Sequence, residues 1–314
     1  MKKARLSIAL MLIALMSVAI LASGCGKDET AAPADSSEPS AVPVEDSTPT
    51  TESAAEETGL SGEYSFGGST TVGAFMDAAI EAFETANPDV SISYEGTGSS
   101  AGIEAVQAGT ISLAGASRGL KQEEMDVGCM AQEVALDGVA VIVNNSVAVD
   151  DLTLEQIAQI YAGEITDWSE IIDGASGEIV VVNRDSASGT RAAFFELVME
   201  KALGKDPEPQ FTTNSIETDS NGNMVATVNS TPNAIGYCGM GYLSELTDGK
   251  AVSVDGVVPS METVVDGSFP ISRYLYFVSF GELDPDGVEQ AFIDFCRGDE
   301  GQNIIEDTGY IKLP

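Results

Sequence analysis

The segment RDSASGTR, residues 184–191, places two arginines around a Ser-Gly-Thr step in a chain with 50 acidic and only 14 basic residues. A helix that starts at such a step leaves main-chain N–H groups open, and its dipole adds partial positive charge there. Small hydroxyl side chains and an arginine beside that end can hold an oxyanion through charge-assisted hydrogen bonds. The segment therefore suggests an anion site.

Two other turns have the same design of strand, Gly/Ser/Thr turn and helix. They are GGSTT at residues 67–71 and GTGSSAG at residues 96–102. A single turn of this kind is most often an ordinary helix cap, since Ser and Thr cap helices well. Three in one chain, with glycines that let an anion approach the backbone, favour one shared site. Arg118, at the end of the GASR segment, adds a further positive charge.

Enzymatic chemistry is poorly supported by the sequence. The chain has no histidine, so it holds neither a Ser-His-Asp triad nor the common zinc sites. The run that begins at Asp219 opens like a calcium loop, but Met224 and Ser230 occupy its sixth and twelfth positions. The turns also lack the phosphate-loop motif of nucleotide hydrolases. We expect no enzyme, no cofactor and no metal.

The acidic composition also argues against nucleic acid as a partner. Three of the 14 basic residues, Lys2, Lys3 and Arg5, lie in an N-terminal export signal, and the others are scattered. Binding to a phosphate backbone needs clustered Lys and Arg. The negative charge itself favours a role in solubility.

The first 60 residues do not resemble a folded domain. Residues 1–24 form a signal peptide, for which a permanent membrane helix is the alternative, and Ala22-Ser23-Gly24-Cys25 resembles the lipobox of bacterial lipoproteins, with Leu21 one position early. We therefore expect lipidation at Cys25. Residues 25–60 are rich in Pro, Ser, Thr and acid, and they predict a disordered tether.

The remainder alternates between short β-branched runs and amphipathic stretches, which predicts an α/β fold with mostly parallel sheets. Strands are expected within residues 62–71, 89–100, 111–118, 134–145, 177–190, 233–243 and 271–280, of which the first, second and fifth segments also include the loop that follows the strand. Helices are expected near residues 72–86, 101–108, 153–161, 190–203 and 288–296. Cys129, Cys238 and Cys296 can form at most one disulfide, and they fit best as core fillers.

Seven motifs in order resemble the phosphate-binding protein of bacterial phosphate ABC importers, from about residue 66 to the C-terminus. They are GSTTV, EGTGSSAGI, GASRGL, YAGEITDWSEI, RDSASGTR, AIGYCGMGYL and DGVVPSMETVVDGSFPISRYLYF. The resemblance implies a type II periplasmic-binding-protein fold, with two α/β lobes on a two-stranded hinge. Lobe one would hold residues 61–142 plus 238–314, and lobe two residues 143–237.

By this resemblance the protein would be an extracytoplasmic, lipid-anchored monomer that captures inorganic phosphate and delivers it to ABC permease subunits. The phosphate-binding residues would be Ser69, Thr70, Thr71, Ser99, Ser100, Ser117, Arg118, Arg184, Ser188, Gly189 and Thr190, with Arg191 as a further helper. Replacing Arg118 should then weaken binding substantially.

One position departs from the best-known form of the family. There an aspartate that accepts the ligand's proton follows the serine of the third strand, whereas Arg118 follows Ser117 here. An arginine cannot accept a proton, which leaves Asp185 as a candidate acceptor. Another oxyanion, sulfate or molybdate, remains an alternative ligand. A surface scaffold protein without transport function is the alternative from a different class.

Overall fold

The computed structural model describes residues 59–314. The expected signal peptide, the lipidated Cys25 and nearly all of the expected tether lie outside the described residues. Within residues 59–314, no helix is both long and apolar enough to cross a membrane.

The described residues contain a nine-stranded sheet with the path β2-β1-β3-β11-β4-β8-β6-β7, in which β9 also pairs with β4. The strands are β1 (Gly62–Gly68), β2 (Val90–Glu95), β3 (Leu113–Ala116), β4 (Cys129–Asn144), β5 (Asp151–Leu152), β6 (Val180–Arg184), β7 (Ile216–Thr218), β8 (Ala234–Gly239), β9 (Gly249–Ala251), β10 (Ser253–Val254) and β11 (Ser272–Phe280). The strands β5 and β10 form a separate parallel pair.

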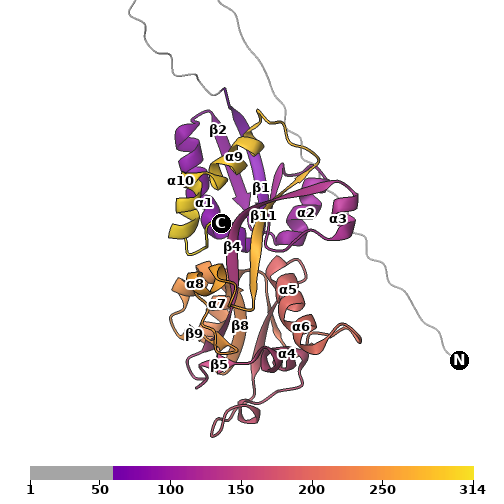
Figure 1. Ribbon diagram of the computed structural model, residues 1–314, viewed down its shortest axis with the longest axis vertical. Coiled ribbons are helices and arrows are strands. Elements are labelled where there is room, and N and C mark those ends of the chain that lie inside the picture. The colour runs from indigo at the N-terminus through magenta and orange to yellow at the C-terminus, as the bar shows by residue number, and fades with distance from the viewer. Residues whose placement is uncertain (1–58) are drawn as a thin grey trace, which may run out of the picture. The chain divides into compact units, whose positions relative to one another are not determined.

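The α/β class is confirmed, but the sheet is mixed. Strands β1, β2 and β3 are parallel, and so are β6, β7 and β8. Between these groups β11 runs antiparallel to β3 and β4, and β4 runs antiparallel to β8. Figure 1 shows β4 and β11 as the long strands that join the upper and lower parts of the sheet. The two strands are antiparallel because β4 takes the chain from the β1–β3 part of the sheet to the β6–β8 part, and β11 returns it.

The helices cover this sheet. They are α1 (Thr70–Ala86), α2 (Ser99–Gln107), α3 (Gln122–Asp126), α4 (Leu154–Ala162), α5 (Gly189–Phe194), α6 (Lys201–Leu203), α7 (Asn221–Ser230), α8 (Met261–Val265), α9 (Val288–Arg297) and α10 (Asp299–Asp307). Shorter turns are η1 (Trp168–Glu170), η2 (Phe195–Glu200) and η3 (Met240–Glu245), of which η2 is a π-helix that joins α5 to α6.

Local signals place most helix ends correctly. The side chain of Thr153 accepts the N–H of Gln156 at the start of α4, and Gly163 ends that helix in the left-handed conformation. Several features differ from the sequence prediction, which did not include helices α3, α7 and α8. Helix α2 begins at Ser99 rather than at Ala101, and α10 was missed because its nine residues hold only two large apolar side chains, Ile304 and Ile305.

Two large hydrophobic cores lie along the sheet. The first core packs α1, α9 and α10 on β1 and β11, through residues such as Phe75, Phe277 and Phe292. The second core is built around β4, β6 and β8, and its members run from Val139 to Ile271, joined by Ile311. Residues 252–271 therefore pack with the second core, although the sequence placed them with lobe one.

The three cysteines of the described region are free and buried. Burial raises the pKa of the Cys238 and Cys296 thiols well above their ordinary value. The expectation that these residues fill the core is confirmed.

Candidate functional site

The three Gly/Ser/Thr turns meet where the two cores adjoin. The hydroxyl of Thr71, at the start of α1, lies 2.9 Å from that of Thr190, at the start of α5. The main-chain N–H of Ser100, at the start of α2, donates to Ala187 O at 3.0 Å. These contacts join segments that are far apart in the sequence, so the predicted convergence of the turns is present in the structure.

Gly189 shows how closely the turns pack. A Cβ atom added there would overlap the hydroxyl oxygens of Ser99 and Ser117. Gly98 has a φ of +93°, and a Cβ atom there would come within 2.8 Å of Ala187 O. Only a residue without a side chain permits these approaches of two backbone segments.

Three serine oxygens in these turns accept hydrogen bonds from the main chain. Ser69 Oγ accepts the N–H groups of Thr71 and Val72, and Ser188 Oγ accepts that of Arg191. Ser99 Oγ accepts the N–H of Ser117 at 3.0 Å, and the two hydroxyls lie 3.2 Å apart. An oxygen that accepts from the main chain keeps its own hydrogen for another acceptor. The side chains are buried, with Ser69, Ser99, Ser117 and Ser188 at most 2% exposed.

Arg184 is the residue of the site that most strongly indicates an anion. It is 1% exposed, and its Nη2 donates to two neutral oxygens, Asp219 O at 2.8 Å and Thr70 Oγ1 at 3.4 Å. Its Nε and Nη1 are buried without a hydrogen-bond partner among the described residues. Burial lowers the pKa of Arg184 below its ordinary value. A buried cation with open donors calls for an anion, because an unpaired buried charge is costly.

Arg118 lies beside the turn at the start of α2 and is paired with an acidic side chain. Its Nη1 and Nη2 pair with both carboxylate oxygens of Glu124, at 2.8 and 2.7 Å, and Nη2 also donates to Ser100 Oγ at 3.2 Å. Burial would raise the pKa of Glu124, but the hydrogen bonds from Arg118 and from the Lys121 N–H hold it below its ordinary value. Much of the charge of Arg118 is therefore matched within the protein, although its Nε has no partner.

Sequence reasoning missed an ion pair between the two long strands. Arg273, on β11, donates from Nη2 to the carboxylate of Asp137, on β4, at 2.8 Å. The same nitrogen lies 3.1 Å from Thr190 Oγ1 and 3.4 Å from Thr71 Oγ1, and Nη1 donates to Ser117 O at 2.8 Å. Burial raises the pKa of Asp137, while the charge of Arg273 opposes that rise. Asp137 interrupts the apolar run from Val134 to Val143 in β4, and Arg273 is the only charged residue of β11. These two positions were the available signal, because buried charges need partners.

Two more residues reach the start of α1. Asn221 Nδ2 lies 3.0 Å from Thr70 Oγ1 and 2.9 Å from Thr71 Oγ1, and Tyr242 donates its hydroxyl to Thr70 O at 2.7 Å. Asn221 belongs to the sequence run that opens like a calcium loop. That run begins α7 instead, and Ser220 caps the helix by accepting the N–H of Asn223.

Two weaker candidates have local roles. The guanidinium of Arg191 lies over the ring of Phe211, 4.7 Å from its centre. Asp185 Oδ1 accepts the N–H groups of Ala187 and Ser188, so this carboxylate shapes the turn that leads into α5. Both side chains therefore have local contacts, although Nε of Arg191 is buried without a hydrogen-bond partner among the described residues.

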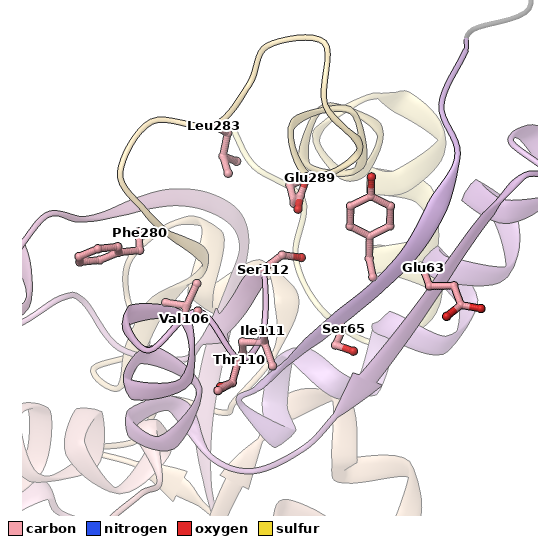
Figure 2. A pocket seen from close by; sticks show the side chains of 11 residues that line it. Glu63, Ser65, Val106, Thr110, Ile111, Ser112, Phe280, Leu283 and Glu289 are labelled. Atoms are coloured by element: carbon pink, nitrogen blue, oxygen red, sulfur yellow. The ribbon is translucent and has the colours of Figure 1, made fainter.

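A surface pocket of about 600 Å³ lies apart from these residues. Figure 2 shows it between the end of α2, the segment Thr110–Ser112 and the chain after β11, with Phe280, Leu283 and Glu289 on one side. None of the candidate anion-binding residues lines it. The candidate site is instead the buried junction of the three turns.

Comparisons with known proteins agree with this geometry. The family model described as the PBP superfamily domain matches residues 53–300. The chain is 32% identical over 251 residues to the phosphate-binding protein PstS of Borreliella burgdorferi, covering 79% of this chain and 89% of that protein. It is 30% identical over 319 residues to PstS of Bacillus subtilis, covering 100% and 95%.

A solved structure is also similar. It is a putative phosphate ABC transporter substrate-binding protein with bound phosphate from Clostridium perfringens, 42% identical in sequence. The TM-score is 0.73, and the match covers 81% of this chain and all of the other.

Proposed function

Since this chain belongs to the PstS family of phosphate-binding proteins, within the PBP superfamily, we propose that it captures inorganic phosphate for an ABC importer. It is a solute-binding protein and not an enzyme. The observation that carries the ligand assignment is Arg184, a buried cation whose Nε and Nη1 are open at the junction of three donor-rich turns. A tetrahedral oxyanion supplies the acceptors that this arrangement lacks.

The proposed phosphate contacts are the hydroxyl and main-chain donors of the three turns together with Arg184. They are Ser69, Thr70, Thr71, Ser99, Ser100, Ser117, Ser188, Gly189 and Thr190, with Arg118 at the edge. The overall negative charge of the protein is no obstacle, because salt screens exposed charges beyond about 10 Å.

The donors come from both cores, so we propose that the protein closes on its ligand by bending at β4 and β11. The packing supports a division into residues 59–138 plus 272–314 and residues 139–271. This division moves the second boundary predicted from sequence from residue 237 to the start of β11. Closure would bring Ser99 and Gly189 together around the anion and exclude water, which strengthens each hydrogen bond.

Titration calorimetry on the soluble protein tests the function. We expect a phosphate Kd on the order of micromolar or tighter, since several charge-assisted hydrogen bonds contribute about 1.5–3 kcal/mol each. Sulfate and molybdate serve as competitors in the same experiment. The absence of binding at millimolar phosphate would refute the proposal.

The effect of Arg118→Ala should be seen mainly in stability. The change leaves Glu124 without its bidentate partner in a nearly buried position, which should cost about 2–4 kcal/mol of unfolding free energy, measured in urea. Phosphate affinity should fall less than in Arg184→Ala. A larger loss of affinity than in Arg184→Ala, with stability unchanged, would place Arg118 at the centre of the site instead.

Attachment to the membrane belongs to the same proposal. The lipobox at Cys25 and the following polar segment would hold the binding protein at the outer face of the cell membrane, as a monomer beside its permease. Metabolic labelling with a palmitate analogue tests the anchor, and Cys25→Ser should abolish the label.

A further inference from the structure

Asn221, the first residue of α7, is fully buried beside the three turns. Its Oδ1 accepts the main-chain N–H of Gly239 at 3.2 Å. A main-chain N–H can only donate, so this bond fixes which end of the amide is oxygen. Nδ2 must therefore face the hydroxyls of Thr70 and Thr71, and it donates to both.

These donations decide where the threonine hydrogens point. A hydroxyl has one hydrogen and two acceptor lone pairs. Thr70 Oγ1 accepts from Asn221 and faces Arg184 Nη2 at 3.4 Å, so its hydrogen is free for another acceptor. Thr71 Oγ1 accepts a hydrogen bond from Asn221 Nδ2 and lies 3.4 Å from Arg273 Nη2.

The two hydroxyls at the starts of α1 and α5 are constrained from both ends. Thr71 Oγ1 accepts from Asn221 Nδ2, and Thr190 Oγ1 accepts from Arg273 Nη2 at 3.1 Å. The two hydroxyls lie 2.9 Å apart, and either can donate to the other. Whichever of them donates, this Thr71–Thr190 pair keeps one hydrogen that must go to an acceptor outside this chain of bonds.

The two buried carboxylates of the described residues already have partners of their own. Asp137 accepts Arg273 through Oδ2 and the Met240 N–H through Oδ1. Glu124 accepts Arg118 through both oxygens and the Lys121 N–H. Each accepts three hydrogen bonds, and no hydrogen bond among the described residues joins either carboxylate to the hydroxyls of Thr70, Thr71 or Thr190.

We propose that Asn221 is a positioning residue that makes Thr70 and the Thr71–Thr190 pair obligate hydrogen-bond donors to the anion. The inference rests on the proposed phosphate function and deepens it. The site would bind an oxyanion whose oxygens facing these hydroxyls carry no proton. Asn221 itself need not touch the ligand.

The isosteric variant Asn221→Asp tests the proposal. One carboxylate oxygen keeps the Gly239 bond, but the other can only accept, so it draws the hydrogens of Thr70 and Thr71 away from the ligand. We expect the phosphate Kd at pH 7.5 to rise by about 100-fold or more, against about 10-fold in Asn221→Ala, where the hydroxyls are free to turn. At lower pH the difference in phosphate Kd between Asn221→Asp and the wild type, both measured at the same pH, should become smaller. Protonation of the new carboxylate gives it a hydrogen that it can donate to a threonine hydroxyl.

Asn303→Asp is the matched control. Asn303 is exposed on α10 and its Oδ1 accepts a hydrogen bond from Lys312 Nζ, so the variant adds the same charge without touching the threonines. It should keep wild-type affinity within about threefold. Equal losses in Asn303→Asp and Asn221→Asp would overturn the proposal, because charge alone would then explain the effect.

The order of phosphate affinities among the variants shows whether Asn221 orients the hydroxyl hydrogens or only supports the turns mechanically. If Asn221 only braced the turns, Asn221→Asp would bind better than Asn221→Ala, since a carboxylate can still bond both hydroxyls, and this order would overturn the proposal. Thr70→Val tests the hydroxyl without adding a charge. Its phosphate affinity should fall by about 10-fold, whereas that of Thr70→Ser should not. Equal phosphate affinity of these two variants would also overturn the proposal. If wild-type protein binds phosphate and Asn221→Asp binds equally, this inference alone fails. If the wild type does not bind, the proposed function fails as well.

Discussion

Arg184→Ala should reduce phosphate affinity by about 10²- to 10⁴-fold, because the change removes a buried guanidinium whose open Nε and Nη1 offer two or more charge-assisted hydrogen bonds. The free energy of unfolding of the ligand-free protein should increase or stay the same, since an unpaired buried charge is removed. Calorimetry gives the affinity, and thermal unfolding with and without phosphate gives the stability. The shift in melting temperature caused by phosphate should disappear in the variant.

Arg297→Ala is the control for Arg184→Ala. Arg297 is exposed at the end of α9, so its removal lowers the positive charge equally without reaching the turns. It should bind phosphate like the wild type. Arg184→Lys keeps the charge but loses the planar guanidinium, so its phosphate affinity should lie between those of the wild type and Arg184→Ala. Wild-type affinity in Arg184→Ala would show that the anion binds elsewhere.

Gly189→Ala should block closure while leaving each part of the fold intact. Gly189 is the first residue of α5, where the backbone tolerates alanine, but the new Cβ atom would overlap the hydroxyl oxygens of Ser99 and Ser117. The overlap exists only when the turns are together. We expect a loss of affinity of about 100-fold or more, with unfolding free energy within about 1 kcal/mol of the wild type.

Small-angle scattering should follow the same variant. The wild type should contract when phosphate is added, whereas Gly189→Ala should keep its larger radius of gyration. Gly119→Ala is the matched control, because a Cβ atom at Gly119 meets nothing within 4 Å. It should contract and bind like the wild type. Contraction of Gly189→Ala with full affinity would contradict the proposed contact between Gly189 and Ser99 in the closed state.

The anion-binding turns could be predicted from the sequence because their signals are local. A strand, a Gly/Ser/Thr turn and a helix follow one another within a few residues, and the capping bonds of Ser69 and Ser188 join atoms two or three residues apart. Arg184 could be assigned because it lies next to one of these turns. Local geometry therefore carried the prediction wherever the partners are close in the chain.

The pairings of the charged residues could not be predicted in this way. Arg273 and Asp137 are 136 residues apart, and nothing near either one indicates the other. Asn221 reaches Thr70 across 151 residues. The sequence assigned Arg118 to the anion site but did not indicate its pairing with Glu124, six residues away on α3. A short separation did not help there, because many acidic residues compete for each arginine in so acidic a chain.

The sequence by itself determined the α/β class, the three Gly/Ser/Thr turns that lead into helices and the absence of histidine chemistry, since these depend on residue types and short spacings. The tertiary structure decided that β11 returns antiparallel beside β4, that residues 252–271 pack with the second core, and that Asn221 orients the hydroxyls of Thr70 and Thr71. Which donor meets which acceptor depends on contacts between distant segments, and those contacts exist only once both cores have formed.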